Sequence, residues 1–346
     1  MSEMKAFQRQ PDFENNLLKV LRGERPLRAT LCEPFISKQK VNRFSTIACP
    51  GDTPTDELRM SVSAMANLGY DYAVCYASSI TFSPGTAEQK HTKSLNGACV
   101  ISDWESFEKY RWPDMQNQDY SRLEKIAPYL PDGMKIMVLG PGGVLENVME
   151  LVGYDNLCFM LYEEPELAKA IFDNVGSRLV EYYNSAASAD TVGVLVSNDD
   201  WGFNTQPFLS PDMMREYLFP WHKKIVETIH SHGKPVILHS CGNYSQIIED
   251  VIEDLKYDAR HSYEDNIIPV EDAYESLNGR IAVIGGIDVN YLVKKTPEEI
   301  ENRARLMLER TWERGGYALG SGNSIADYVP EENYLAMLRA AHEFKG

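Results

Sequence analysis

The feature that most constrains the fold is a regular alternation of short apolar segments with amphipathic ones. Eight segments have the length and apolar content of buried strands, and most are followed by apolar residues at helical spacing. Strands are expected at residues 27–36, 70–76, 135–139, 192–196, 235–240, 257–262, 281–285 and 317–320. Such alternation implies right-handed crossovers and a parallel sheet. Eight units predict an α/β fold, a (β/α)8 TIM barrel with an N-terminal extension and insertions, as a single domain over residues 1–346.

An open doubly wound sheet is the alternative architecture. It usually has fewer units and carries a G-x-G-x-x-G fingerprint in its first turn. The sequence has no such motif after a strand and no P-loop. The turn Gly140-Pro141-Gly142-Gly143 is interpreted as a strand-to-helix connection rather than a phosphate-binding loop. Helices are expected near residues 11–22, 57–68, 119–129, 144–152, 155–162, 165–187, 210–232, 244–254, 269–277, 297–314 and 330–343.

Composition excludes several classes of partner. With 34 basic and 51 acidic residues the net charge is −17, which disfavours nucleic acid and anionic membranes as partners and favours small molecules. The N-terminus lacks the apolar run of a signal peptide, and no apolar stretch approaches the roughly 18 residues of a membrane span. A cytoplasmic protein is therefore expected, with its six cysteines reduced. They are Cys32, Cys49, Cys75, Cys99, Cys158 and Cys241.

The short strand at 235–240 ends in a motif with metal-binding chemistry. Side chains alternate along a strand, so His239 and Cys241 point into the same space at its carboxyl end. Imidazole and thiolate are preferred ligands of zinc. Alternatively, His239 is a hydrogen-bonded core histidine and Cys241 a small buried apolar residue.

Polar residues also follow the other expected strands, where (β/α)8 barrels place their catalytic groups. They are Glu33, Asp199, Asp200, His261, Glu264, Asp265, Asp288, Asn323 and Ser324. Each has a structural alternative. Asp199 and Asp200 could cap a helix or brace loops, and His261 could orient a ligand rather than bind metal. The pair Glu264-Asp265 could be solvated, and Asp288 could cap the helix that follows it.

Four motifs together resemble the uroporphyrinogen decarboxylase superfamily, in order and in spacing, over about residues 10–344. They are Asp199-Asp200-Trp201-Gly202, His239-Ser240-Cys241-Gly242-Asn243, Gly285-Gly286-Ile287-Asp288, and Gly322-Asn323-Ser324-Ile325 followed by Val329-Pro330-Glu331-Glu332-Asn333. The superfamily comprises the decarboxylase of haem biosynthesis and zinc methyltransferases that act with corrinoid proteins or coenzyme M. The resemblance implies a (β/α)8 barrel, independently of the strand count.

Departures from the family patterns favour the methyltransferase branch. The decarboxylase branch has an arginine-rich N-terminal motif and a histidine in a C-terminal Gly-His-Gly-Ile motif. Here the stretch 27–35 contains only Arg28, and Asn323 stands in the histidine's place. The acidic composition also disfavours a porphyrinogen that carries many carboxylates.

The resemblance implies a zinc site at His239 and Cys241, because the methyltransferases bind zinc with His-x-Cys and a later cysteine. That cysteine is missing, since its place falls near Asn323. Glu33 is the first candidate for the third ligand and Cys32 the second, because both end the first expected strand. A carboxylate ligand agrees with the methyltransferase subunits of aryl-ether O-demethylases, which share this barrel.

The implied function is zinc-dependent transfer of a methyl group between a small substrate, either a methoxylated aromatic compound or a thiol, and a corrinoid protein. The chain has no Asp-x-His-x-x-Gly cobalamin motif, so the corrinoid is expected on a partner protein. Catalytic roles are expected for Asp199, Asp200, His261 and Asn323. Substrate contacts are expected for Trp201, Glu264 and Ser324, and the aromatic stretch 104–112 could cover an aromatic substrate.

Two other functions stay open. A uroporphyrinogen decarboxylase-like carboxy-lyase would act on a tetrapyrrole or a smaller acid through the pair Asp199-Asp200. A ligand-binding barrel without catalysis is suggested only by the missing third cysteine. The sequence leaves the oligomeric state open, a homodimer included.

Overall fold

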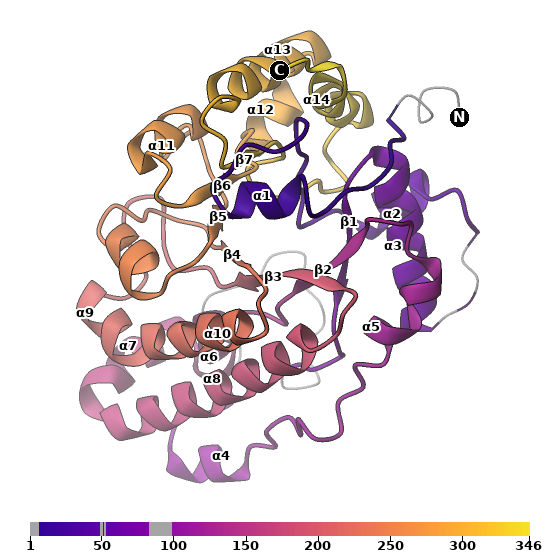
Figure 1. Ribbon diagram of the computed structural model, residues 1–346. Helices are drawn as coiled ribbons and strands as arrows, with labels where there is room; N and C mark the ends of the chain where they lie inside the picture. The colour runs from indigo at the N-terminus through magenta and orange to yellow at the C-terminus, as the bar shows by residue number, and fades with distance from the viewer. Residues whose placement is uncertain (1–6, 49–50, 52, 83–98) are drawn as a thin grey trace.

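The computed structural model describes residues 7–48, 51, 53–82 and 99–346, so Cys49 and part of the irregular stretch 80–115 lie outside the described residues. Its centre is a curled, fully parallel sheet of seven strands that pair in chain order, with helices around it (Figure 1). The strands are β1 (Tyr72–Tyr76), β2 (Lys135–Leu139), β3 (Val192–Asn198), β4 (Val236–His239), β5 (Ala259–His261), β6 (Ala282–Ile284) and β7 (Tyr317–Ala318). Seven of the eight expected strands are thus present in the expected order.

The strand expected at 27–36 is the exception. This segment makes only two isolated parallel bridges, Leu31 to Leu319 and Ile36 to Ile325. The first bridge places the segment beyond β7, but its other side makes no ladder with β1 within the described chain. Instead of joining a ladder, the backbone N–H of Glu33 donates to the Tyr72 hydroxyl. The next residue, Pro34, has no N–H to donate, so a regular strand cannot continue through it. A fully closed eight-stranded barrel is therefore not formed by backbone pairing alone.

The longer helices begin at the signals that the sequence carries. Both α3 and α13 start with Thr-Pro and a capping box, made by Thr53 with Asp56 and by Thr296 with Glu299. The helices are α1 (Leu17–Leu21), α2 (Lys38–Phe44), α3 (Pro54–Leu68), α4 (Trp104–Lys109), α5 (Arg122–Lys125), α6 (Val144–Val152), α7 (Tyr154–Glu163), α8 (Pro165–Ala187), α9 (Pro211–Met213), α10 (Phe219–Ser231), α11 (Val270–Leu277), α12 (Val289–Lys294), α13 (Pro297–Thr311) and α14 (Glu331–Glu343).

Several expected helices are shorter or broken. The helix expected at 11–22 is reduced to α1, and that expected at 119–129 to α5 and one 3₁₀ turn. The helix expected at 210–232 splits into α9, a π-helical turn at Met214–Leu218 and α10, with Pro220 in the first turn of α10. In the segment expected to be helical at 244–254, helical structure begins only at residue 248 and continues as a π-helical turn at Asp250–Asp254. No helix among the described residues is long and apolar enough to cross a membrane.

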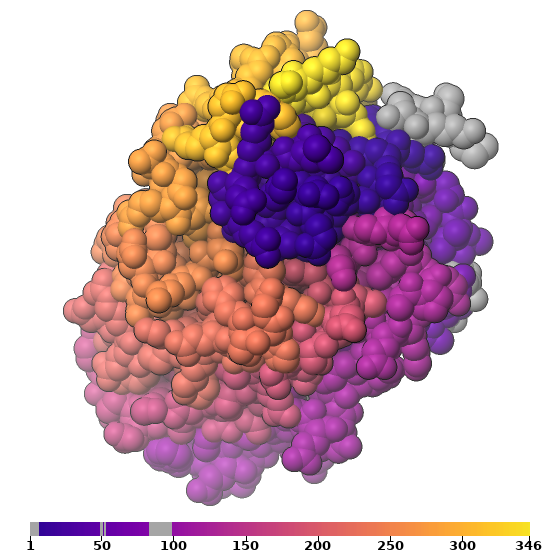
Figure 2. All heavy atoms as spheres, viewed as in Figure 1, coloured from indigo at the N-terminus to yellow at the C-terminus, as the bar shows by residue number. Residues whose placement is uncertain are grey.

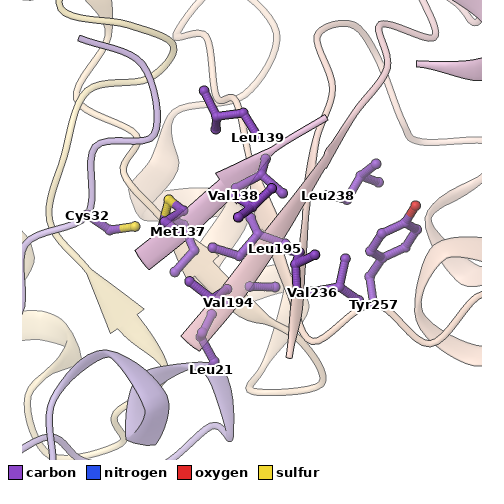
Figure 3. Packing of buried hydrophobic residues seen from close by; sticks show 14 of the residues in the cluster. Leu21, Cys32, Met137, Val138, Leu139, Val194, Leu195, Val236, Leu238 and Tyr257 are labelled. Atoms are coloured by element: carbon purple, nitrogen blue, oxygen red, sulfur yellow. The ribbon is translucent and has the colours of Figure 1, made fainter. Parts of the chain in front are cut away.

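The N-terminal segment covers one end of the sheet. Figure 2 shows its indigo atoms over the middle of this face. In Figure 3, Leu21 of α1 lies beside Val194, near the start of β3, so α1 covers the amino ends of the strands. The opposite end, where the strands finish, is the edge at which the polar residues of the sequence gather. Asp199, Asp200, His239 and His261 all lie there.

Candidate metal site

Three side chains converge at the carboxyl ends of β3 and β4. Ligand atoms of Asp200, His239 and Cys241 all lie within 4.8 Å of one another. Strand pairing creates this group, because Asn198 at the end of β3 is in register with His239 at the end of β4. Asp200 also accepts a hydrogen bond from the Cys241 backbone N–H at 2.9 Å. The expected pairing of His239 with Cys241 is therefore formed, and Asp200 joins it.

Close backbone packing holds the two loops in this arrangement. Gly242 has φ +107°, and a Cβ there would lie 2.5 Å from the Gly202 carbonyl oxygen. The neighbouring Asn243 N–H donates to the Phe203 carbonyl at 2.9 Å. Only glycine fits at position 242, so the glycine that follows Cys241 fixes the distance between the two loops.

The donor set fits a zinc ion. In a tetrahedral site with bonds of 2.0–2.3 Å, ligand atoms lie about 3.3–3.8 Å apart, so the ligand atoms of Asp200, His239 and Cys241 need to approach one another by no more than about 1–1.5 Å. One nitrogen, one sulfur and one carboxylate oxygen are all ligands that zinc accepts. Three protein ligands leave a fourth position for a small molecule, as in catalytic zinc sites.

Two polar side chains face the sulfur of Cys241. The Asn323 amide donates to Sγ at 3.2 Å, and the Ser262 hydroxyl lies 3.4 Å from it. Ser262 has φ +86°, a conformation uncommon outside glycine, and such strain concentrates at functional sites. Burial raises the pKa of the Cys241 thiol, and the Asp200 carboxylate raises it further. The thiol is therefore protonated at neutral pH unless a cation binds beside it.

A buried hydrogen-bonded chain continues behind His239. Its Nδ1 lies 2.7 Å from Nδ1 of His261, whose Nε2 lies 3.3 Å from the Ser321 carbonyl oxygen. Ser321 in turn donates its backbone N–H and its hydroxyl to the two carboxylate oxygens of Glu33, each at 2.8 Å. Burial lowers the pKa of His239 to about 3, with a smaller contribution from the charge of Arg260. Burial also lowers the pKa of His261 and raises that of Glu33 to about 8.

The structure does not bring either candidate third ligand to the pair His239 and Cys241. Both oxygens of Glu33 are engaged by Ser321, and Glu33 is fully buried. The Cys32 thiol points toward Met137 of β2 in the apolar core (Figure 3) and accepts from the Tyr72 hydroxyl at 3.6 Å. Asp200, for which a role in orientation or proton transfer is expected from the sequence, is the third group that could hold a metal ion with them.

Asp199 belongs to a different cluster from Asp200. Its carboxylate accepts the backbone N–H groups of Leu145 and Glu146, both at 2.9 Å, at the start of α6. His222 of α10 donates to the same carboxylate at 2.8 Å. A Cβ on Gly143 would lie 2.0 Å from the Asp199 carboxyl carbon, which explains the glycine at the end of the β2–α6 turn. Asp199 thus has the helix-capping role considered as its alternative.

The remaining predicted residues lie around this edge. Asp288 caps α12 through the Tyr291 N–H, as its alternative role requires. Asp265 forms an ion pair with Arg303. Trp201 is buried against Phe219 and His222. Glu264 and Ser324 are partly exposed. The aromatic stretch 104–112 forms α4 and the residues after it, with Phe107 and Tyr110 packed on Trp112.

A statistical model of the family described as uroporphyrinogen decarboxylase (URO-D) matches residues 107–344, more than half of the chain. The chain belongs to the uroporphyrinogen decarboxylase family. It is similar to the uroporphyrinogen decarboxylases of Anaeromyxobacter dehalogenans (27% identity over 237 residues) and Geobacter sulfurreducens (25% over 248 residues). These alignments cover 64% and 66% of this chain and 65% and 69% of the relatives.

Among solved structures, a methyltransferase from Methanosarcina mazei has the same fold. Its TM-score is 0.70 at 18% identity, over 96% of this chain and 99% of that one. The superfamily expected from the motifs is confirmed, and the fold is that of a TIM-like member of the URO-D family. The choice of branch within the family stays a prediction.

Sequence reasoning missed three residues of this region and gave a fourth, Asp200, a different role. From the sequence, Asp200 is expected to act in orientation or proton transfer. Its position, two residues after β3 and beside the strand that carries His239, is the signal that could have placed it with His239. Ser262 and Ser321 have no distinctive sequence signal. Arg260 is a charged residue in the buried strand β5, and its guanidinium carbon lies 4.0 Å from the centre of the Tyr244 ring. A charged residue in the middle of a short buried strand is the one signal of this set that a sequence carries openly.

Proposed function

We propose that this URO-D family protein is a zinc-dependent methyltransferase that moves a methyl group between a small substrate and a corrinoid carried by a partner protein. The observation that carries the proposal is the convergence of Asp200, His239 and Cys241 at the carboxyl edge of the sheet. A nitrogen, a sulfur and an oxygen ligand lie there together, and three protein ligands leave the fourth coordination position of a zinc ion to a small molecule. The name of the Methanosarcina mazei neighbour gives additional support.

Zinc at this site would hold a substrate thiol as thiolate or polarise the oxygen of a methyl ether. The chain's own groups prepare the site for this chemistry. Asn323 and Ser262 face the Cys241 sulfur and stabilise negative charge on it. Glu264 is half-buried, and burial, Asp288 and Asp200 all raise its pKa. It is the carboxyl group best suited to hold a proton for a leaving phenolate.

Barrel closure and partner docking are part of the same proposal. The segment 30–36, which bridges to Leu319 and Ile325, would act as the eighth strand of a (β/α)8 barrel. The corrinoid would approach the carboxyl edge, because the N-terminal segment covers the other end (Figure 2). A methoxylated aromatic compound and a thiol are the two substrate classes that suit this chemistry.

The names of the sequence relatives favour a second candidate, a decarboxylase of the URO-D type. Two observations weigh against it. For binding substrate carboxylates, the stretch 27–35 contains only Arg28. This arginine is paired at 2.5 Å with the buried Asp71, next to the start of β1. Asp199, one of the two carboxylates that such a reaction would use, has its oxygens engaged by α6 and His222.

An anaerobic assay with free methylcobalamin and a panel of thiols, or with free cob(I)alamin and methoxylated aromatic compounds, tests the proposal. The zinc-loaded protein should change the cobalamin absorbance, and His239→Ala should lose this activity. His342→Asn, which alters a histidine of α14 that bonds the Leu68 carbonyl, serves as the matched control and should retain it. Carbon dioxide release from uroporphyrinogen that persists with a chelator, and no methyl transfer, would favour the decarboxylase instead.

A further inference from the structure

We propose that Glu33, Ser321 and His261 form a buried positioning relay that sets the tautomer and ring orientation of His239. The inference rests on the metal site proposed above and deepens it, because it assigns a role to residues that do not touch the metal. It also gives Glu33 a function other than that of a ligand.

Hydrogen-bond counting fixes the direction of the relay. The Ser321 carbonyl oxygen can only accept, so Nε2 of His261 must carry the proton that it donates. In a neutral ring, Nδ1 of His261 is then an acceptor. Its partner at 2.7 Å, Nδ1 of His239, must therefore be the donor. This leaves the lone pair of His239 on Nε2, free to bind a metal ion.

The opposite arrangement is unfavourable in this environment. It would require a doubly protonated His261, a cation that is fully buried and has no ion pair with a carboxylate within the described chain. Burying an unpaired charge costs several kcal/mol or more, about the scale of total protein stability.

Glu33 extends the relay because it accepts hydrogen bonds from Ser321, the residue whose carbonyl oxygen accepts from His261. Two hydrogen bonds from one residue, Ser321, to the two oxygens of Glu33 fix the position of that peptide. The Gly285 backbone packs closely against Ser321, since a Cβ on Gly285 would lie 2.2 Å from the Ser321 carbonyl oxygen. The aromatic ring of Phe35 covers His239, with ring centroids 4.5 Å apart, and closes the other side.

The decisive experiment is nitrogen NMR of the histidine rings in zinc-free protein at neutral pH, with His239 assigned by substitution. The relay predicts that His239 carries its proton on Nδ1. His261→Phe, which removes the acceptor, should let the Nε2–H tautomer of His239 appear, and His261→Asn, whose side-chain oxygen can accept, should restore the Nδ1–H form.

Zinc affinity, measured by competition with a chromophoric chelator, provides the second readout. His261→Phe should weaken binding by about 10–100-fold, the usual effect of losing a partner that orients a ligand. Glu33→Ala should weaken it by a smaller factor, Glu33→Gln by less again, and His342→Asn not at all.

An Nε2–H tautomer of His239 in the wild-type protein would overturn the relay, as would a His261→Phe variant with unchanged tautomer and zinc affinity. If His261→Phe does not fold, the wild-type tautomer decides the question alone. Because the tautomer is measured without zinc, failure of methyl transfer with the predicted tautomer would count against the proposed function and not against the relay.

Discussion

Two neighbouring aspartates, Asp199 and Asp200, belong to two aspartate–histidine clusters with opposite properties. Asp199 and His222 form a closed cluster, in which the carboxylate accepts from two backbone N–H groups and from His222. Nδ1 of His222 lies 2.7 Å from the Tyr257 hydroxyl. The side chains of Asp199 and His222 are both fully buried. Asp200, His239 and Cys241 form an open cluster, in which Asp200 and Cys241 are partly exposed. Within the described residues, His239 bonds through Nδ1 and its Nε2 makes no hydrogen bond.

The difference shows how the same residue types serve structure and chemistry. In the closed cluster every strong donor meets an acceptor, which stabilises the connection between β3, α6 and α10. In the open cluster His239 is held through Nδ1 and Asp200 accepts from the Cys241 backbone N–H, while Nε2 of His239 remains available to a ligand. Partial exposure and an available imidazole nitrogen, rather than residue type, therefore distinguish the candidate site from the closed cluster.

The largest expected effect separates the clusters by metal affinity. Cys241→Ala and Asp200→Ala should each weaken zinc binding by on the order of 10³-fold, because each removes one of three protein ligands. His222→Asn should change it by less than about threefold, since His222 orients no ligand atom. Chelator competition measures all three variants, and equal losses in the three would mean that the clusters are not distinct.

Substitutions in the closed cluster should destabilise the fold more than substitutions in the open cluster. Asp199→Ala should lower the free energy of unfolding of the zinc-free protein by about 3–5 kcal/mol, because it leaves buried donors unpaired. Asp200→Ala should lower it by no more than about 1 kcal/mol, since one carboxylate contact is lost at a partly exposed position. Urea denaturation provides the measurement. A larger loss for Asp200→Ala than for Asp199→Ala would reverse the assignment.

The pH dependence of zinc binding should report one proton. Burial and Asp200 raise the pKa of Cys241, so zinc must displace the thiol proton, whereas His239, with a pKa of about 3, is already neutral. Zinc affinity should therefore rise about tenfold per pH unit between about pH 6 and 8, and Cys241→Ala should lose most of this slope. Calorimetry in buffers of different ionisation enthalpy counts the protons. A slope of two would contradict the neutral state of His239.

The smallest effect concerns Asn323, which donates to the Cys241 sulfur at 3.2 Å. Asn323→Cys places a second thiol where the methyltransferase branch is expected to have one. It should tighten zinc binding by about tenfold and add a second sulfur to the metal. Asn323→Ser, which keeps a hydrogen-bond donor and matches the shape of cysteine without its sulfur, is the control and should leave affinity within about threefold. Unchanged affinity and a single sulfur in Asn323→Cys would show that position 323 does not reach the metal.

Local patterns predicted the strand order and the pair His239 and Cys241 correctly. The rule of alternating side chains holds there because β4 is a regular strand up to His239. The same rule failed to locate a third ligand near Glu33, because the segment 27–36 is irregular and Glu33 faces Ser321, 288 residues away in sequence. It also could not distinguish Asp199 from Asp200, since the difference depends on the distant N-terminus of α6.

X-ray absorption at the zinc edge of the wild-type protein, loaded with one equivalent of zinc, tests the central claim most directly. The structure predicts one sulfur ligand at about 2.3 Å, with nitrogen and oxygen ligands at about 2.0–2.1 Å, and loss of the sulfur signal in Cys241→Ala. Zinc that has no sulfur ligand, or folded protein that binds no zinc, would contradict it.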